Sequence, residues 1–241
     1  MKKLLLFAAC MFGPLPALAA SVPNIPLDKS NGGPPKSIAL MGVPEPSRFQ
    51  VRDFYRVANL AGPLGGFAAG SVDADRTKKF LEEAVIANKV KFGERLAADL
   101  QHDLEEAGFT VEFLGDQIKK VKKAADGKTD DFSAVSTDKD AILAVWFGPI
   151  GFLSSAKLST KFQSSVDVNA KLIDRATQKV LYQKTYVYGY DLGLDKAELL
   201  VVDEKYQFGD FDDLMKRKDL AIEALDSGLK VTASRITADL R

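Results

Sequence analysis

The only histidine in the chain, His102, is the residue whose type would matter most for catalysis. A Ser-His-Asp triad or a Cys-His pair would need this imidazole, and the sequence has no G-x-S-x-G turn to supply a serine nucleophile. Zinc chemistry takes several His or Cys ligands, and the chain has a single residue of each type. His102 stands among acidic residues on the polar side of a leucine stripe. We therefore interpret it as a solvated surface residue and expect no catalytic centre, no metal site and no cofactor.

Carboxylates are the remaining candidates for chemistry. They form two clusters: Asp126, Asp130 and Asp131, and Asp203, Glu204, Asp210, Asp212 and Asp213. A carboxylate pair can act as the acid and base of a glycosidase or bind Ca²⁺, but neither cluster has the spacing of a calcium loop. We interpret both as solvated loops, with residues 210–213 at a helix N-terminus, where negative charge is favourable. A carboxylate-dependent cell-wall hydrolase is the alternative.

The stretch NLAGPLGGFAAGSV, residues 59–72, carries Gly62, Gly66 and Gly70 at a spacing of four. A phosphate-binding loop is excluded because no lysine follows the last glycine. Small residues at this spacing can also bring helices close together, in lipid or in an oligomer. The uncharged run of residues 57–72 is nevertheless too short to span a bilayer. In a helix, Pro63 fits only at the first position, which leaves two of the three glycines inside.

Three arginines upstream of this stretch, Arg48, Arg52 and Arg56, would share one face of a helix and could contact a membrane surface. Two interpretations of the glycine-rich stretch stay open. We favour a mobile connector, or a helix packed closely on its own domain. The alternative is a helix that contacts a membrane or packs in an oligomer.

Four tyrosines, Tyr182, Tyr186, Tyr188 and Tyr190, alternate along one predicted strand and would lie on the same face of it. Such a row could stack on glycan rings or on a partner protein. It could equally pack beneath a helix or across the sheet, and we favour packing.

The N-terminus has the features of an export signal. Two lysines precede an apolar run, and Ala17 and Ala19 predict cleavage before Ala20, so residues 1–19 form a signal peptide. The alternative processing site is Cys10, whose context FAAC resembles a lipobox and would lead to lipidation. Loss of Lys2 and Lys3 changes 33 basic and 33 acidic residues to 31 and 33, a balance that does not favour nucleic-acid binding.

The rest of the chain predicts one domain. Residues 20–36, rich in Pro and Gly, read as a linker, and residues 37–241 form the domain, with a glycine-rich insertion near residues 57–72. Apolar runs predict strands at residues 37–43, 110–114 and 141–153, the last bent at Gly148 and Pro149. Helical periodicity begins at Arg76 and continues through residues 96–107, with a stop at Gly108.

A hairpin and a final helix follow. Residues 161–174 alternate apolar and polar side chains, residues 179–190 return as a second strand, and residues 222–240 form an amphipathic helix. Residues 117–131 are expected to be an exposed helix fragment and loop. The order predicts an α/β or α+β two-layer sandwich: one mixed sheet with a C-terminal antiparallel hairpin, backed by two long amphipathic helices.

The segments ERLAADLQHDLEEAGFTV, DAILAVWF and VDVNAKLIDRATQKVLYQKTYVYGY resemble a known envelope group. The chain is similar to the periplasmic domains of the penicillin-binding-protein-activator lipoproteins, the curli-secretion lipoprotein and the TolB amino-terminal domain, over roughly residues 37–241. The resemblance implies a non-catalytic domain of the Gram-negative envelope that binds other proteins. It transfers no functional residue.

From these observations we expect a non-enzymatic exported protein that is periplasmic or associated with the outer membrane. It would bind or help assemble another envelope component. The partner would be an envelope protein or a cell-wall component rather than a nucleic acid. The first alternative is a structural protein that self-associates or contacts a membrane through the glycine-rich segment. The second is the cell-wall hydrolase.

Overall fold

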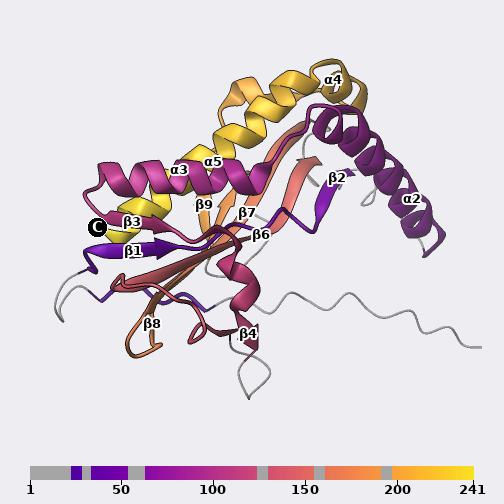
Figure 1. The fold of residues 1–241 in the computed structure, drawn as a ribbon. Coiled ribbons are helices and arrows are strands. Elements are labelled where there is room, and N and C mark those ends of the chain that lie inside the picture. The colour runs from indigo at the N-terminus through magenta and orange to yellow at the C-terminus, as the bar shows by residue number, and fades with distance from the viewer. Residues whose placement is uncertain (1–22, 29–33, 54–62, 124–129, 155–160, 191–196) are drawn as a thin grey trace, which may run out of the picture.

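One mixed β-sheet forms the centre of the protein (Figure 1). The computed structural model describes residues 23–28, 34–53, 63–123, 130–154, 161–190 and 197–241, with residues 63–70 and 116 described by their backbone only. The main strand order is β3-β1-β6-β7-β8-β9. The bounds are β1 Ser37–Leu40, β3 Thr110–Phe113, β6 Ala141–Ser154, β7 Phe162–Asp174, β8 Val180–Tyr188 and β9 Glu198–Leu200. The predicted mixed sheet is confirmed.

The hairpin strands β7 and β8 extend an antiparallel meander that begins with β6. The pairing of β6 with β7 shifts between Phe147, opposite Val168, and Ile150, opposite Val166. Three steps along β6 therefore match two along β7, which is a β-bulge at Gly148 and Pro149. The bend predicted at this position is confirmed.

Two further strands attach beside this meander. β2, Phe49–Asp53, runs parallel to the second half of β6, and β10, Gln207–Phe208, pairs with the start of β7. Because β1 pairs with the first half of β6, β1 and β2 lie one after the other along the same side of that strand.

Helices cover one face of the sheet. α3, Phe92–Glu106, and α5, Lys218–Leu240, pack on each other (Figure 1). α5 also packs on β7 and β8, and α3 on β3. The predicted leucine stripe of α3, Leu96, Leu100 and Leu104, is fully buried, and each such leucine stabilises the fold by about 1.5–3 kcal/mol. α3 ends just before Gly108, whose φ of 93° is unfavourable for other residues. The two predicted backing helices are confirmed.

Residues 115–123 and 130–131 lie on the opposite face. They form the 3-10 helix η2, Gly115–Lys120, and the two short strands β4, Lys122–Lys123, and β5, Asp130–Asp131. Leu114, Phe132 and Val135 in and around this segment pack on Met41 and Ile142 of the sheet. The expectation of an exposed helix fragment and loop is therefore wrong for the two strands, which a run of lysines does not suggest.

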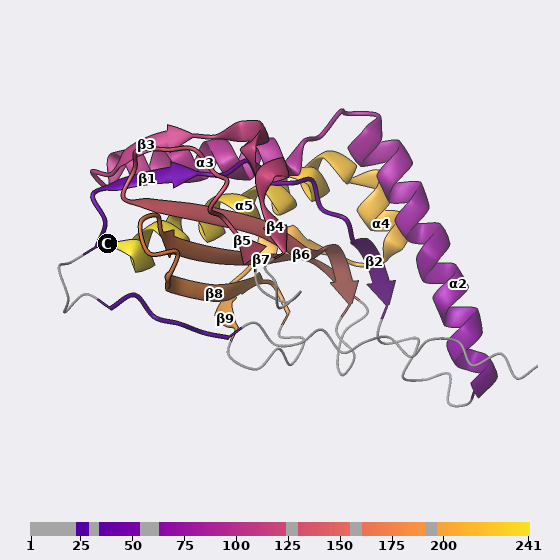
Figure 2. The same cartoon turned by 60° about the horizontal axis from the view of Figure 1, so that its bottom comes forward.

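The glycine-rich stretch enters a helix earlier than expected. α2 spans Pro63–Phe80 and continues into a π-helical turn, η1 Leu81–Ile86. Pro63 occupies the first helical position, the one place where its missing N–H does no harm. Gly66 and Gly70 therefore lie inside a helix. Of the two forms of the favoured interpretation, residues 63–72 have the helix, which packs on β2 (Figure 2), and not the mobile connector. No helix within the described ranges combines the length and the apolar character needed to cross a bilayer.

The helical face proposed for Arg48, Arg52 and Arg56 is also wrong. Arg52 lies in strand β2, Arg48 directly precedes that strand, and Arg56 falls outside the described residues. Two arginines four apart share one side of a strand as well as one side of a helix, so the spacing alone does not separate the two structures.

Candidate functional site

α2 closes the outer edge of β2, and this pair of elements builds the candidate site. β2 pairs on one side with β6. On its other side the N–H of Val51 donates to Thr77 Oγ1 over 2.9 Å, and the N–H of Asp53 donates to Asp73 Oδ1 over 3.3 Å. Free N–H groups on an edge strand recruit other strands. Side chains of α2 occupy two of them here, so another chain cannot simply add a strand at these positions.

Arg76 anchors the C-terminal part of α2. Its Nη1 lies 3.5 Å from Asp53 Oδ2 and 3.5 Å from Asp73 Oδ1. Its guanidinium lies over the rings of Phe162 and Phe211, with centroid distances of 5.9 and 5.6 Å. Burial raises the pKa of Asp73, and the Arg76 charge opposes that rise. Buried charges are tolerated when paired in this way, so α2 is held to β2 at a defined position.

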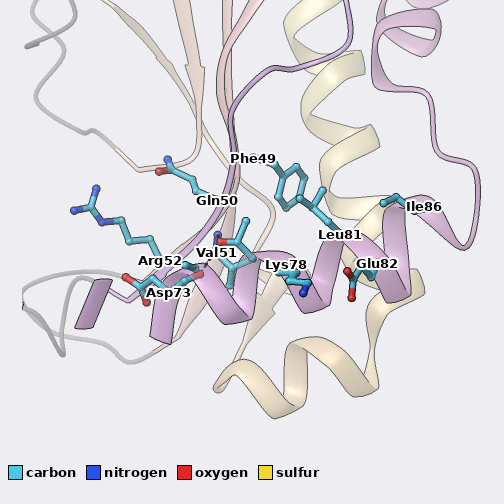
Figure 3. A pocket seen from close by; sticks show the side chains of 11 residues that line it. Phe49, Gln50, Val51, Arg52, Asp73, Lys78, Leu81, Glu82 and Ile86 are labelled. Carbon is cyan, nitrogen blue, oxygen red and sulfur yellow. Dashed lines mark hydrogen bonds between the residues drawn. The ribbon is translucent and has the colours of Figure 1, made fainter. Parts of the chain in front are cut away.

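A groove of about 530 Å³ lies between the two elements (Figure 3). Phe49 and Val51 from β2 and Leu81 and Ile86 from the helical side supply its apolar lining. Figure 3 shows Phe49, Leu81 and Ile86 toward one end, and Gln50, Arg52 and Asp73 toward the other. Ile86 is 66% exposed, which is unusual for a large apolar residue next to other apolar side chains.

Two local features of the sequence produce this groove. Phe49 stacks on Phe80 and Phe92, with centroid distances of 5.7 and 6.3 Å, so its ring is fixed from behind. The π-helical turn of η1, in which the Ala87 N–H reaches back to the Glu82 carbonyl, changes the helical register at its end. Ala84 is thereby buried and Ile86 is presented to solvent. Such π-turns frequently accompany functional sites.

The structure brings some of the predicted interaction residues to this groove and not others. Arg52 lines it directly, and α2, which carries Gly66 and Gly70, forms one wall. Gly62, like Arg56, falls outside the described residues, as do Cys10 and the predicted signal peptide.

The tyrosine row belongs to the core. Tyr182, Tyr186 and Tyr188 are buried on the helix-facing side of β8, and Tyr190 follows the end of that strand. The hydroxyls of Tyr182 and Tyr186 donate to Asp239 Oδ2 of α5 over 3.1 and 2.7 Å. Burial raises the pKa of both hydroxyls. The three buried rings therefore offer no exposed stripe for a glycan or a partner.

The network around Asp239 is compensated from within the protein. Lys184 Nζ lies 2.6 Å from Asp239 Oδ2 and also pairs with Glu198, while Arg235 pairs with both carboxylates. Burial raises the pKa of Asp239, but hydrogen bonds from Lys184 and Tyr186 lower it, and the pKa is lowered overall. The network joins the last turns of α5 to β8 and β9.

Several described members of the acidic clusters have structural roles. Asp210 caps α4, Phe211–Lys216, by accepting from the N–H of Asp213 over 2.8 Å. Asp203 caps the short helix η3, Glu204–Tyr206, in the same way, and Asp130 pairs with Lys123 over 2.6 Å. The predicted helix N-terminus at residues 210–213 is confirmed. Asp126 falls outside the described residues.

One buried carboxyl escaped the sequence analysis. The alternation of residues 161–174 predicts Asp167 on the polar face of its strand, yet it is only 5% exposed. Within the described part of the chain its Oδ1 has no hydrogen-bond partner. Burial raises the pKa of Asp167 to about 7, against the opposing charge of Arg48. It lies opposite the β6 bulge, so the signal that could have found it is the Gly148-Pro149 bend facing an acidic residue in the next strand.

Comparisons with solved structures find weak similarities. The chain is similar to a PelC variant crystallised as a dodecamer from Paraburkholderia phytofirmans, at 12% identity over 91% of this chain and 95% of that chain, with a TM-score of 0.32. It is similar to lipoprotein GNA1162 from Neisseria meningitidis, at 17% identity over 66% and 90%, with a TM-score of 0.29. A Xanthomonas campestris protein described by the family model DUF330 is 11% identical over 90% and 92%, with a TM-score of 0.34.

No protein-family model and no curated protein matches the chain. Likenesses at these scores assign no role to any residue, and the envelope group named from the sequence stays a prediction.

Proposed function

We propose that this chain is a non-enzymatic exported protein of the cell envelope that binds or helps assemble another envelope component. The groove between α2 and β2 would be its docking site. Export rests on the N-terminal sequence, which has the pattern of a signal peptide. The observation that carries the docking role is the groove itself, in which Ile86 is exposed next to the half-buried Phe49 and Leu81, beside a strand edge that is already occupied.

The occupant we propose is an apolar helical segment of a partner protein. Strand addition is disfavoured because Thr77 and Asp73 already accept from the outward N–H groups of β2. Recognition must then rest on side chains, and an apolar floor flanked by charges suits the apolar face of an amphipathic helix. Arg52 and Lys78 are balanced by Asp73 and Glu82, so the groove has no net charge that would select a polyanion or an anionic membrane.

The absence of enzymatic activity is proposed on the positions of the reactive groups. His102, the only histidine, does not line the groove. The described members of the acidic clusters Asp130, Asp203, Asp210 and Asp213 serve as helix caps and ion pairs. No pair of them is left as an acid and base facing a shared cavity among the described pockets.

A photocrosslinking experiment in intact cells tests the docking site. Ile86 in the groove, or Val201 just after β9, is replaced by p-benzoylphenylalanine; both are apolar and exposed, 66% and 86% respectively. We expect position 86 to crosslink to one envelope protein and position 201 to give no such product. Leu81→Glu in the groove should abolish the crosslink, and the matched change Leu199→Glu on β9 should preserve it. Equal products at both positions, or a crosslink that survives Leu81→Glu, would contradict the proposal.

Self-association is the second candidate, because Gly66 and Gly70 lie one turn apart in α2. Sedimentation and fractionation of Gly66→Leu separate it from the first candidate: unchanged oligomer size and unchanged membrane association remove it. Turnover of purified peptidoglycan that is lost in Asp203→Asn would instead support the hydrolase and overturn the non-enzymatic assignment.

A further inference from the structure

The buried carboxyl of Asp167 is a titratable group that the proposed docking function does not use. Its side chain is 5% exposed, and within the described part of the chain its Oδ1 has no hydrogen-bond partner. A buried charge without a partner is costly, so such a group either keeps its proton or is neutralised by a nearby cation. Burial raises the pKa of Asp167 to about 7. The carboxyl therefore changes its charge near neutral pH.

Asp167 lies at one end of a row that crosses three strands. Phe49 of β2 pairs with Ile150 of β6, which in turn pairs with Val166 of β7. Arg48 directly precedes Phe49, and Asp167 directly follows Val166. The three paired residues belong to the core beneath the helices. Because successive side chains of a strand point to opposite faces, Arg48 and Asp167 belong to the other face of the sheet, on the two sides of β6.

The β6 bulge places a glycine between these two residues. A Cβ at Gly148 would lie 2.9 Å from Asp167 Oδ2, so the carboxyl already extends over β6. On the other side of β6 the Arg48 carbonyl accepts from the N–H of Ile150 over 3.0 Å, which fixes the backbone of the arginine. Neighbouring strands are about 4.8 Å apart, a distance that an extended arginine side chain covers. The guanidinium can therefore reach the carboxyl above Gly148, which has no side chain to separate them.

The charge of Arg48 acts on this carboxyl. It opposes the rise in the pKa of Asp167 that burial causes. Arg48 is exposed, so its guanidinium can move between the carboxyl and solvent without disturbing the core. The attraction between the two groups exists only while the carboxyl is ionised, since an opposite charge favours the charged form of its neighbour.

The other charged groups on this face have partners elsewhere. Arg52, two alternations further along β2, interacts with Asp73 (Figure 3). Lys171, further along β7, has its Nζ 3.8 Å from Asp130 Oδ2. The described neighbours of Asp167 on this face of β6 and β8 carry no titratable group: Trp146, Thr185 and Val187. Arg48 is thus the cation whose position depends on the state of Asp167.

We propose that Asp167 and Arg48 form a pH-sensitive latch across the β6 bulge. When the carboxyl is ionised, Arg48 closes over Gly148 and pairs with it; when the carboxyl is protonated, Arg48 returns to solvent. Phe49 follows Arg48 and lines the groove between α2 and β2, so the closed latch would hold one wall of that groove in place. Docking would then be stronger above about pH 7 than below it. This last step rests on the proposed docking function, whereas the latch itself does not.

Trp146, the only tryptophan, reports on the carboxyl because it is a diagonal neighbour of Asp167 across β6 and β7. We expect the fluorescence of the full chain to titrate with a midpoint near pH 7, and Asp167→Asn to lack this transition. Arg48→Gln should raise the midpoint by about one pH unit, because a charge that favours the ionised carboxyl is lost. Arg48→Lys should restore most of the shift. The matched control Arg52→Gln, on the same face of β2, should leave the midpoint unchanged.

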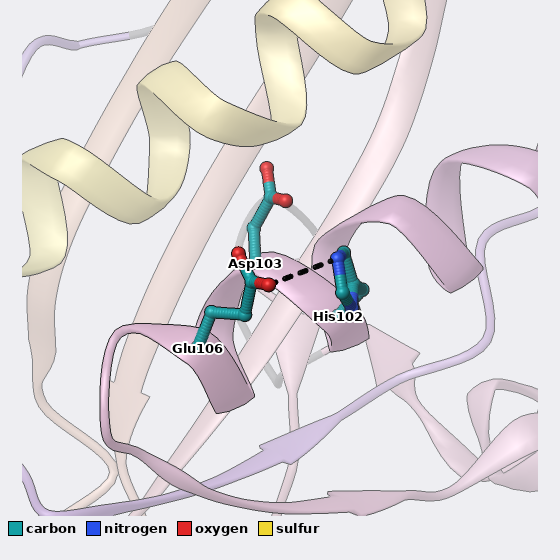
Figure 4. A group of neighbouring side chains, drawn as sticks. All are labelled: His102, Asp103 and Glu106. Carbon is teal, nitrogen blue, oxygen red and sulfur yellow. Dashed lines mark ion pairs between the residues drawn. The ribbon is translucent and has the colours of Figure 1, made fainter.

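The imidazole of His102 is a second group that can change its charge near neutral pH. It lies on α3, 3.4 Å from Glu106 Oε1 (Figure 4), and α3 covers the opposite face of the sheet. Asp167→Asn retains His102, so loss of the transition in that variant assigns it to Asp167. A transition that persists in Asp167→Asn would overturn the latch, and so would a midpoint that Arg48→Gln leaves in place.

Crosslinking from position 86, repeated in envelope preparations at pH 6 and pH 8, tests the link to docking. We expect at least about threefold more product at pH 8 in the wild-type background, and equal product at both pH values in the Arg48→Gln background. Equal product in the wild type, with the Trp146 titration intact, would overturn the link to docking and leave the latch supported. A Trp146 titration as expected with no crosslink at either pH would instead contradict the docking function alone.

Discussion

The carboxyl of Asp167 occupies the space that a side chain at Gly148 would need. A Cβ built on Gly148 would lie 2.8 Å from Asp167 Cβ and 2.9 Å from its Oδ2. The β6 bulge therefore depends on a glycine at this position, and the glycine in turn lets an acidic residue lie buried in the centre of the sheet. The first two predictions follow from this pair.

Replacing Asp167 by Asn should change how stability depends on pH. Burial raises the pKa of Asp167 from 3.8 to about 7. Between these values the folded protein holds a proton that the unfolded chain has released, so rising pH favours unfolding by about 1.4 kcal/mol per unit. The Asp167→Asn variant has no carboxyl at this position, so its stability does not fall in this way as the pH rises. We expect urea denaturation to give a stability difference, variant minus wild type, that increases from pH 5 to pH 7 and levels off above about pH 8.

The matched control for this prediction is Asp138→Asn, at an exposed carboxyl that pairs with Lys139. Its stability difference from the wild type should not rise over the same pH range. Parallel pH profiles for Asp167→Asn and the wild type would show that the carboxyl is not protonated in the folded protein.

Gly148→Ala should destabilise the protein by about 1–3 kcal/mol, because the new methyl group has no space without movement of β6 or β7. Combining it with Asp167→Gly, which removes the opposing side chain, should recover part of this loss, giving a coupling energy above about 0.5 kcal/mol. Gly209→Ala is the control, since its nearest contact would be 3.7 Å away. Strict additivity in thermal or urea denaturation would contradict the described contact.

Thr77→Val should loosen the edge of β2. The variant keeps the shape of the side chain but removes the acceptor for the buried N–H of Val51, at a cost of about 1–3 kcal/mol. Hydrogen exchange followed by NMR should show faster exchange of the Val51 amide. Thr110→Val, at an exposed position of β3, serves as the control and should leave the Val51 amide protected. Unchanged protection in Thr77→Val would mean that the hydroxyl does not cap the strand.

Tyr186→Phe should cost more stability than Tyr188→Phe. The Tyr186 hydroxyl donates to the charged Asp239 over 2.7 Å, whereas the Tyr188 hydroxyl is 3.5 Å from Ser227 Oγ. Loss of a hydrogen bond to a charged group costs about 1.5–3 kcal/mol, and a bond at the longer distance contributes under about 1 kcal/mol. Equal losses in denaturation experiments would indicate that the network around Asp239 does not depend on this hydroxyl.

The sequence was sufficient for elements whose side chains repeat with a clear period. The leucines of α3 and the alternation in β7 each fit one period only, and both elements have the predicted type. It was insufficient for α2, since glycine is a poor helix former. Thr77 and Asp73 bonded to β2, and Arg76 held between two rings, help to stabilise that helix. These contacts are tertiary and leave no local pattern.

The groove could not be predicted for a related reason. Its walls come from residues 49–52 and 73–86, which are near in sequence but face each other only because β2 pairs with β6. Nothing in the sequence of β2 indicates that its partner is the second half of a later strand. Likewise, the alternation in β7 correctly placed the Asp167 side chain on the other face of the strand from Val166 and Val168. It could not show that this polar face would be buried.

The pairing of β2 with β6 has a consequence for how the molecule folds. Asp53 and its partner Ser154 are 101 residues apart. β1 likewise pairs with Ala141 and its neighbours, which come much later in the chain. During synthesis both N-terminal strands therefore emerge long before the strand that completes them. Contacts of such long range form slowly, because a large loop must close first. The β6–β7–β8 meander is local enough to assemble by itself, so we expect the N-terminal strands to add to an existing sheet as the late step. Until then they remain accessible to whatever chaperones accompany the nascent chain.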